Sequence, residues 1–182
     1  MEVSKKDIRI GDNVIFKRES KDVIAFLVSA FIKIFYPNWD RWGWHMAVII
    51  ERVALPHGEI DWKVLEATMP SARVNYLSNM NECRIYRWFN KPLDLDKIDA
   101  FVNKHLGCKY DIWKYLFTVT YGILRYTFKI NLGKWENDEY YCWEMVEEFN
   151  EQMGKPFTTK HETLILPDLQ KLLESSGCDN IP

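Results

Sequence analysis

Hydrophobic and polar positions in the first half of the chain follow the short periods that are typical of β-strands. Val14 and Phe16 alternate with other residues after a turn-like Gly-Asp pair, which indicates a half-buried strand. Three successive apolar residues at 48–50 indicate a strand that is buried on both faces. A Pro-His-Gly turn at 56–58 predicts a hairpin tip after that strand. The predicted strands are residues 13–17, 44–51, 61–68, 73–77 and 83–88.

The second half of the chain changes to helical patterns that are bounded by residues typical of helix ends. Pro92 and Gly107 bracket one such segment, and Asn137 or Asp138 can cap another. A further helix is predicted early in the chain. The predicted helices are residues 21–36, 94–106, 110–120, 138–153 and 167–175. Because no repeat or linker divides the chain, residues 1–182 are predicted to form one α+β domain.

The composition is that of a folded protein. The 182 residues are 47% hydrophobic and 27% charged, and a chain of this length can bury a core without metals or disulfides. The net charge is -2 and no basic stripe is present, so nucleic acid is not expected as a partner. Aromatic residues reach 15%. They indicate a core rich in rings or, as the less favoured alternative, a groove lined with rings for a peptide or acyl chain.

The chain carries no segment that predicts membrane spanning or secretion. Its most apolar stretch, residues 23–35, is too short to cross a bilayer and is interrupted by Lys33. A buried core helix is favoured there, and a helix that contacts a membrane surface stays an alternative. Charged residues follow Met1 almost at once, so no signal peptide is predicted and a cytoplasmic location is expected. No C-x-x-C pair occurs among the four cysteines, which we expect to be free thiols.

Cys142 is the candidate nucleophile, because it falls near the start of the predicted helix 138–153. Unpaired backbone N–H groups and the positive end of the helix dipole favour a thiolate at such a position. The same N–H groups can stabilise the oxyanion of a tetrahedral intermediate. Apolar residues at helical spacing after Cys142 would turn the thiol toward the sheet. The alternative is an inert cysteine in the core.

His45 and Glu66 are the candidate partners of this thiol. A thiolate nucleophile needs a nearby imidazole, and the imidazole needs a third group that orients it. His45 begins the predicted strand 44–51, and Glu66 lies near the end of the strand that returns from the hairpin tip. Pairing of the two strands could bring the carboxylate to the imidazole. The alternatives are a structural histidine at the sheet rim and a solvated carboxylate.

Five short segments in this order resemble the circularly permuted NlpC-type papain-like hydrolases, the YiiX-like group, to which lecithin:retinol acyltransferase-type enzymes are related. In these families the strand with the histidine precedes the helix with the cysteine. The resemblance covers residues 10–170. The segments are Gly11-Asp12, Trp44-His45-Met46-Ala47-Val48-Ile49, Val64-Leu65-Glu66-Ala67, Gly107-Cys108-Lys109-Tyr110-Asp111 and Tyr141-Cys142-Trp143-Glu144.

The resemblance implies a permuted papain-like fold with a small, barrel-like antiparallel sheet packed against helices. It implies that Cys142 is the nucleophile, His45 the general base and Glu66 the orienting residue. Three aromatic residues next to these segments are candidates for the substrate site: Tyr141, Trp44 and Tyr110. Trp143 departs from the family, in which a small residue often follows the nucleophile, and it could narrow the cleft or point into the core.

The expected activity is hydrolysis of an amide in a peptide or lipid-linked substrate through an acyl-enzyme, without a cofactor or metal. An acyltransferase or thioesterase that uses the same triad is one alternative. A binding module whose activity has lapsed is another. The third is a zinc site formed by Cys142, His45 and Glu66, for which the sequence shows no dense ligand motif.

Overall fold

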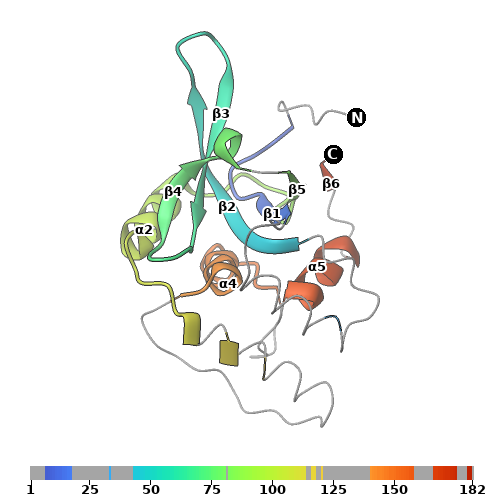
Figure 1. Cartoon of the computed structure of the whole chain (residues 1–182). Helices are drawn as coiled ribbons and strands as arrows, with labels where there is room; N and C mark the ends of the chain where they lie inside the picture. Colours follow the sequence, from blue (N-terminus) through green and yellow to red (C-terminus); the bar gives the residue numbers. More distant parts are fainter. Residues whose placement is uncertain are drawn as a thin grey trace.

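An antiparallel β-sheet forms the centre of the protein in the computed structural model (Figure 1). The structure describes residues 7–17, 33, 43–80, 82–113, 116–117, 120, 140–157, 166–175 and 180–181. All strand pairs in the sheet are antiparallel, and the strand order is β4-β3-β2-β1-β5-β6. The strands are β1 (Asn13–Lys17), β2 (Gly43–Ala54), β3 (Ile60–Glu66), β4 (Arg73–Tyr76), β5 (Cys83–Tyr86) and β6 (Asn180–Ile181).

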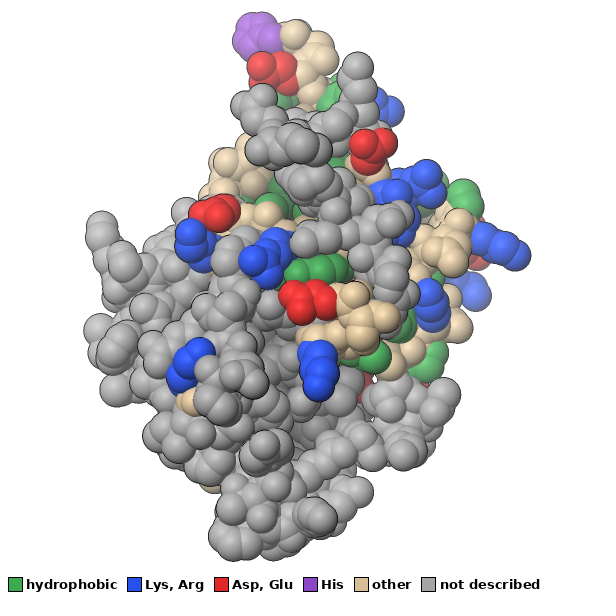
Figure 2. Space-filling model, turned by 90° about the vertical axis from the view of Figure 1, so that its right-hand side faces the viewer, with side chains coloured by type: hydrophobic (Ala, Val, Ile, Leu, Met, Phe, Trp, Pro, Cys, Tyr) green, Lys and Arg blue, Asp and Glu red, His purple; other side chains and the backbone are tan. Residues whose placement is uncertain are grey.

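All five predicted strands are present, and β2 and β3 are joined at the predicted hairpin tip. Val48, Ile49 and Ile50 are buried, as the apolar run in β2 predicts. The outer part of the hairpin stands clear of the body in the space-filling view and carries a histidine at its tip (Figure 2). Beyond the segment that pairs with β1, β2 therefore extends as an arm, whereas its first residues lie over the helices.

The described helices pack against the sheet through two groups of buried side chains. Helices α4 (Cys142–Gln152) and α5 (Leu166–Ser175) meet β2, and α2 (Leu95–His105) joins α4 on the outer strands of the same sheet (Figure 1). A third group of buried residues, which includes Phe16, Ala47 and Val64, lies on the opposite face. Side chains alternate between the two faces of a strand. The short apolar runs in β1 and β2 therefore contribute buried side chains to both faces of the sheet.

The helix that contains Cys142 starts later than its sequence predicts. Asn137 and Asp138, the expected caps, lie outside the described residues, but α4 begins only at Cys142 and Tyr141 is its N-cap. Tyr140 is still extended, because its backbone forms a parallel bridge with Tyr110. The predicted cap is therefore wrong for this helix, and Cys142 occupies its first position.

The remaining predictions for helices have mixed outcomes. Helix α2 lies within the predicted segment 94–106 and is capped by the Asp94 side chain, which accepts a bond from Asp96 N at 3.0 Å. Helix α5 matches the predicted helix near the C-terminus. The predicted helix 21–36 lies outside the described residues except for Lys33, and only parts of 110–120 are described.

The described elements form a mixed α and β structure that agrees with the predicted α+β class. The sheet has two edges, β4 and β6, so the described strands do not close into a barrel. Within the described residues, no helix is long and apolar enough to cross a membrane.

Candidate active site

Strand pairing brings His45 and Glu66 together. Glu66 lies opposite Ala47 in the β2–β3 register, and His45 is two residues away on the same side of β2. Glu66 Oε2 lies 2.8 Å from His45 Nε2. The His45 ring also stacks on the ring of Phe16, its partner across the β1–β2 pair, with the centroids 5.8 Å apart. The predicted proximity of the two residues is thus confirmed.

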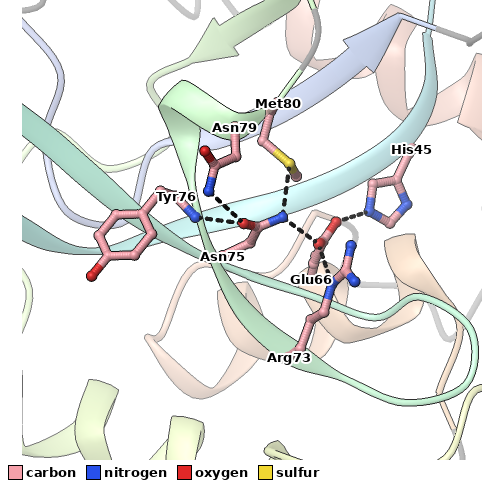
Figure 3. Close-up of polar contacts among 7 residues, drawn as sticks. All are labelled: His45, Glu66, Arg73, Asn75, Tyr76, Asn79 and Met80. Carbon is pink, nitrogen blue, oxygen red and sulfur yellow. Dashed lines mark hydrogen bonds and ion pairs between the residues drawn. The ribbon is translucent and has the colours of Figure 1, made fainter.

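The other oxygen of Glu66 is held by two side chains from β4 (Figure 3). Arg73 Nε donates to Glu66 Oε1 at 2.8 Å, and Asn75 Nδ2 donates to the same oxygen at 3.2 Å. The Glu66 side chain is only 3% exposed, whereas the Arg73 side chain is 57% exposed. Asn75 is fixed in turn by the backbone N–H of Tyr76, which donates to Asn75 Oδ1 at 2.9 Å. These bonds leave Glu66 Oε2 facing the imidazole.

Cys142 completes the group from the start of α4. Its thiol interacts with the His45 side chain, and this interaction raises the pKa of His45. Because His45 Nε2 faces Glu66, the ring nitrogen left for the thiol is Nδ1. Cys142 is 2% exposed and packs in the same core cluster as Met46, the residue that follows His45. His45 therefore interacts with both the Cys142 thiol and the Glu66 carboxylate.

The charges in this chain shift the pKa values of both His45 and Glu66. Burial alone would lower the pKa of His45, but the hydrogen bonds and charges of Cys142 and Glu66 outweigh it and raise the pKa from 6.5 to about 9. Burial alone would raise the pKa of Glu66, but bonds from His45, Arg73 and Asn75 lower it to about 2. Glu66 is thus a carboxylate and His45 an imidazolium at neutral pH.

The backbone around Cys142 suits the stabilisation of an oxyanion. Tyr141 is the N-cap of α4, and its side chain makes no capping hydrogen bond to the helix. The first N–H groups of an α-helix have no partner within the helix. At the first position of α4, the N–H of Cys142 is one of these groups, and it lies next to the thiol. The helix dipole adds partial positive charge at this end.

The segment 107–111 fixes where α4 begins. Its backbone bonds to residues 70–72 on one side, through Gly107 N to Ala72 O at 2.9 Å and Ala72 N to Cys108 O at 2.8 Å. On the other side, Asp111 N donates to Tyr140 O and Tyr140 N donates to Lys109 O, at 3.1 and 3.2 Å. The segment thereby ties the loop after β3 to the residues just before Cys142. The Tyr110-Asp111 motif therefore has a structural role beside the start of α4.

The predicted substrate residues have different surroundings. Tyr141 is buried, and its ring packs edge-on against Trp143 with centroids 4.9 Å apart. Tyr110 is partly buried against the core. The Trp44 side chain lies outside the described part, although its backbone belongs to β2. Contact of these three residues with a substrate stays a prediction. Trp143 is 1% exposed and packs in the core.

A second cluster of titratable side chains braces α4 against α2. His105 is fully buried, its Nδ1 lies 2.8 Å from Phe101 O, and its Nε2 lies 3.3 Å from Glu148 Oε1. Lys104 Nζ lies 2.9 Å from the same carboxylate oxygen, and the Tyr140 side chain interacts with Glu148. Burial would raise the pKa of Glu148, but these three partners lower it to about 2. The cluster holds Tyr140, two residues before Cys142.

This cluster predicts a dependence of stability on pH. A carboxyl whose pKa is lower in the folded state stabilises the fold above its unfolded pKa of 4.5, and this contribution disappears as the pH falls toward 2. In Glu148→Gln, the free energy of unfolding should therefore fall less between pH 5 and pH 2 than in wild type, by on the order of 2 kcal/mol.

Urea unfolding at several pH values measures this difference. The matched control is Glu151→Gln, because Glu151 is an exposed residue of the same helix. The role assigned to Glu148 is wrong if both variants show the acid dependence of wild type.

The three site residues are linked one to the next rather than converging on a common point. Glu66 contacts His45, and His45 contacts Cys142. Among the described residues, no three His, Cys, Asp or Glu side chains form a group that could hold a metal ion. The zinc alternative therefore has no ligand set in this part of the chain.

Arg73, Asn75 and Phe16 belong to the site but were not predicted from the sequence. A signal for the first two was present, since polar residues at 73 and 75 flank an apolar Val74. In a strand paired with β3, that alternation places both polar side chains on the side of Glu66. The sequence does not show that residues 73–75 pair with β3, so the contacts with Glu66 could not be predicted.

No protein-family model matches the sequence, and no curated protein matches it at a significant level. Any functional conclusion therefore depends on the chemistry of the site itself.

Proposed function

We propose that this protein is a cysteine-nucleophile hydrolase of the permuted papain-like type, which cleaves an amide in a peptide or lipid-linked substrate through an acyl-enzyme. The observation that carries the proposal is the chain of contacts from Cys142 to His45 and from His45 to Glu66. A nucleophile, a base and an orienting group in hydrogen-bond reach of one another are what such catalysis needs. The order of the strands and the Cys-bearing helix supports the permuted fold.

In the proposed reaction, Cys142 Sγ attacks the substrate carbonyl carbon, and the N–H of Cys142 donates to the developing oxyanion. When the C–N bond breaks, the leaving amine takes the proton from His45 and a thioester remains. Water then attacks the thioester and gives its proton to His45. The C–S bond breaks, a carboxylic acid leaves, and the imidazolium again faces the thiolate. Glu66 holds the imidazole throughout.

Acyl transfer is the second candidate, because the nucleophile is only 2% exposed. A site that excludes water protects an acyl-enzyme until another acceptor arrives. The same thioester would form, and only the second step would differ. Supplying amine, alcohol or lysophospholipid acceptors and measuring the partition between acid and transfer product separates the two activities.

Alkylation by iodoacetamide tests the proposal without knowledge of the substrate. We expect Cys142 to be alkylated fastest of the four cysteines at pH 6–7, because a thiolate beside an imidazolium is reactive at pH values where ordinary thiols are not. Cys83 is the internal comparison, since burial and the charge of Glu82 raise its pKa to about 11. Mass spectrometry of peptides after timed labelling gives each rate.

His45→Ala should remove the advantage of Cys142 below pH 8. The reagent is small, which suits a thiol with little exposed surface. The proposal fails if Cys142 reacts no faster than Cys83 and Cys108 at neutral pH. It also fails if the His45 variant keeps the wild-type rate for Cys142, and a binding module on this fold then becomes the better hypothesis.

A further inference from the structure

The carboxylate of Glu66 is shared between two cations. Its Oε2 contacts His45 from β2, and its Oε1 accepts from Arg73 of β4, each at 2.8 Å. Arg73 lies directly opposite Glu66 in the β3–β4 register. In Figure 3 both cationic side chains reach the buried carboxylate from different strands. The single negative charge of Glu66 is therefore paired with both an imidazole and a guanidinium.

This arrangement matters for the second half of the proposed reaction. To activate water, His45 must be neutral, because only a neutral imidazole can accept the proton. The thiolate no longer holds the imidazole charged once Cys142 carries an acyl group. Glu66, however, keeps its charge in the acyl-enzyme. A buried carboxylate with no other partner would hold His45 in its protonated form and slow the release of product.

We propose that Arg73 is a positioning residue that fixes Glu66 and offsets part of its charge, so that His45 can become neutral and act as a base toward water. The inference rests on the proposed hydrolase function. Among the described residues, His45 and Glu66 face each other. Two further ionisable groups face this pair: Arg73 from β4 and the Cys142 thiol from α4. Asn75 and Phe16 contact the pair as neutral groups.

The exposure of Arg73 limits the size of this effect. More than half of its side chain is open to solvent, which screens its charge. The offset is therefore partial: Glu66 still orients the imidazole and remains a carboxylate. Asn75 would continue to hold Glu66 Oε1 if Arg73 were replaced, since its own bond to that oxygen is independent.

Titration of His45 by NMR tests this role independently of turnover. In a Cys142→Ala background, which has no thiolate, ¹³C-labelled histidine reports His45 under the influence of Glu66 and Arg73 alone. The His45 signal is the one that His45→Gln removes. We expect Arg73→Met to raise the His45 pKa in this background by about 0.5–1 unit, and Arg73→Lys to restore most of the difference.

Arg52→Met is the control, because it removes the same charge from an exposed position on the β2 arm and should leave the His45 titration unchanged. An unchanged or lower His45 pKa in Arg73→Met would overturn the proposal. So would an equal shift in the Arg52 variant, because the effect would then reflect net charge alone.

The kinetic consequence is measured in proteins that retain Cys142. We expect deacylation of an acetyl-enzyme made with p-nitrophenyl acetate to be about 3–10-fold slower at pH 7 in Arg73→Met and to recover at higher pH. A purely structural defect would lower the rate at all pH values, and that result would count against the proposal. If wild-type protein forms no acyl-enzyme, the hydrolase proposal fails, whereas the NMR titration still decides whether Arg73 tunes His45.

Discussion

The Cys142→Ala variant should form no acyl-enzyme and lose about 10³-fold or more of any acyl-transfer or hydrolytic activity of the wild-type protein. The expected loss is large because the nucleophile forms the covalent bond, and removing the nucleophile of a triad that acts as a unit costs nearly as much as removing all three members. Intact-protein mass spectrometry after mixing with p-nitrophenyl acetate measures the covalent step, and release of nitrophenolate measures turnover.

Two further variants test whether the loss of activity comes from the missing nucleophile or from a folding defect. Cys142→Ser nearly preserves the side-chain volume but has a hydroxyl that stays protonated, so it should also be inactive. Cys83→Ala removes a different, partly buried thiol of β5 and should keep wild-type activity. Unfolding of Cys142→Ala should remain cooperative, with a change of about 1 kcal/mol for the small buried atom that is lost. Wild-type acylation by Cys142→Ala would contradict the assignment.

The contact between His45 and Glu66 could be predicted because it depends on a local hairpin. The turn at 56–58 connects two strands that pair next to each other, and the apolar pattern in each strand fixes which side chains share a face. Even with the bulge between Ile49 and Glu51, Glu66 remains opposite Ala47. Once that register holds, the imidazole and the carboxylate must lie close together. The open end of the hairpin, where β2 begins and β3 ends, thus contains two of the three candidate catalytic groups.

The first residue of α4 could not be predicted in this way, because a contact distant in sequence decides it. Asn137 and Asp138 have suitable cap chemistry, but the bridge between Tyr110 and Tyr140 keeps the chain extended up to Tyr141. Local propensity contains no information about that bridge. Its consequence is chemical, since it places Cys142 itself, rather than an earlier residue, at the positive end of the helix.

The burial of His105 follows from the helical spacing of apolar residues. The helix 94–106 is rich in charge. Ile98, Phe101 and His105 are nevertheless spaced three and four residues apart, and all three are buried on one face of α2. This spacing marks the face of the helix that packs on the core. The position of Glu148 opposite His105 required the packing of α2 on α4, which no local pattern reveals.

For Glu66, we expect glutamine to be the more damaging substitution for activity and alanine the more damaging one for stability. In Glu66→Gln, Arg73 and Asn75 both donate to the position of Oε1, so the amide oxygen must face them. The amide NH₂ then faces His45 Nε2 and donates to it. The imidazole proton is thereby held on Nδ1, the nitrogen that faces Cys142, and the ring cannot accept a proton from the thiol or from water.

A carboxylate-to-amide change that imposes the wrong imidazole tautomer can cost up to about 10⁴-fold in rate. We therefore expect Glu66→Gln to lose about 10³–10⁴-fold in acylation of Cys142 at pH 7. Glu66→Ala leaves either tautomer accessible and should lose about 10–10²-fold. The pKa of His45 should fall in both variants, because the charge of Glu66, which helps to raise it in wild type, is removed.

Stability should follow the opposite order. Alanine removes the carboxylate acceptor of Asn75 and opens space under Arg73, so Glu66→Ala should be about 1–2 kcal/mol less stable than Glu66→Gln. Stopped-flow acylation and urea unfolding of the two variants measure both orders in the same preparations. If Glu66→Gln acylates as fast as Glu66→Ala, Glu66 does not set the tautomer of His45, and its bonds to β4 serve the fold alone.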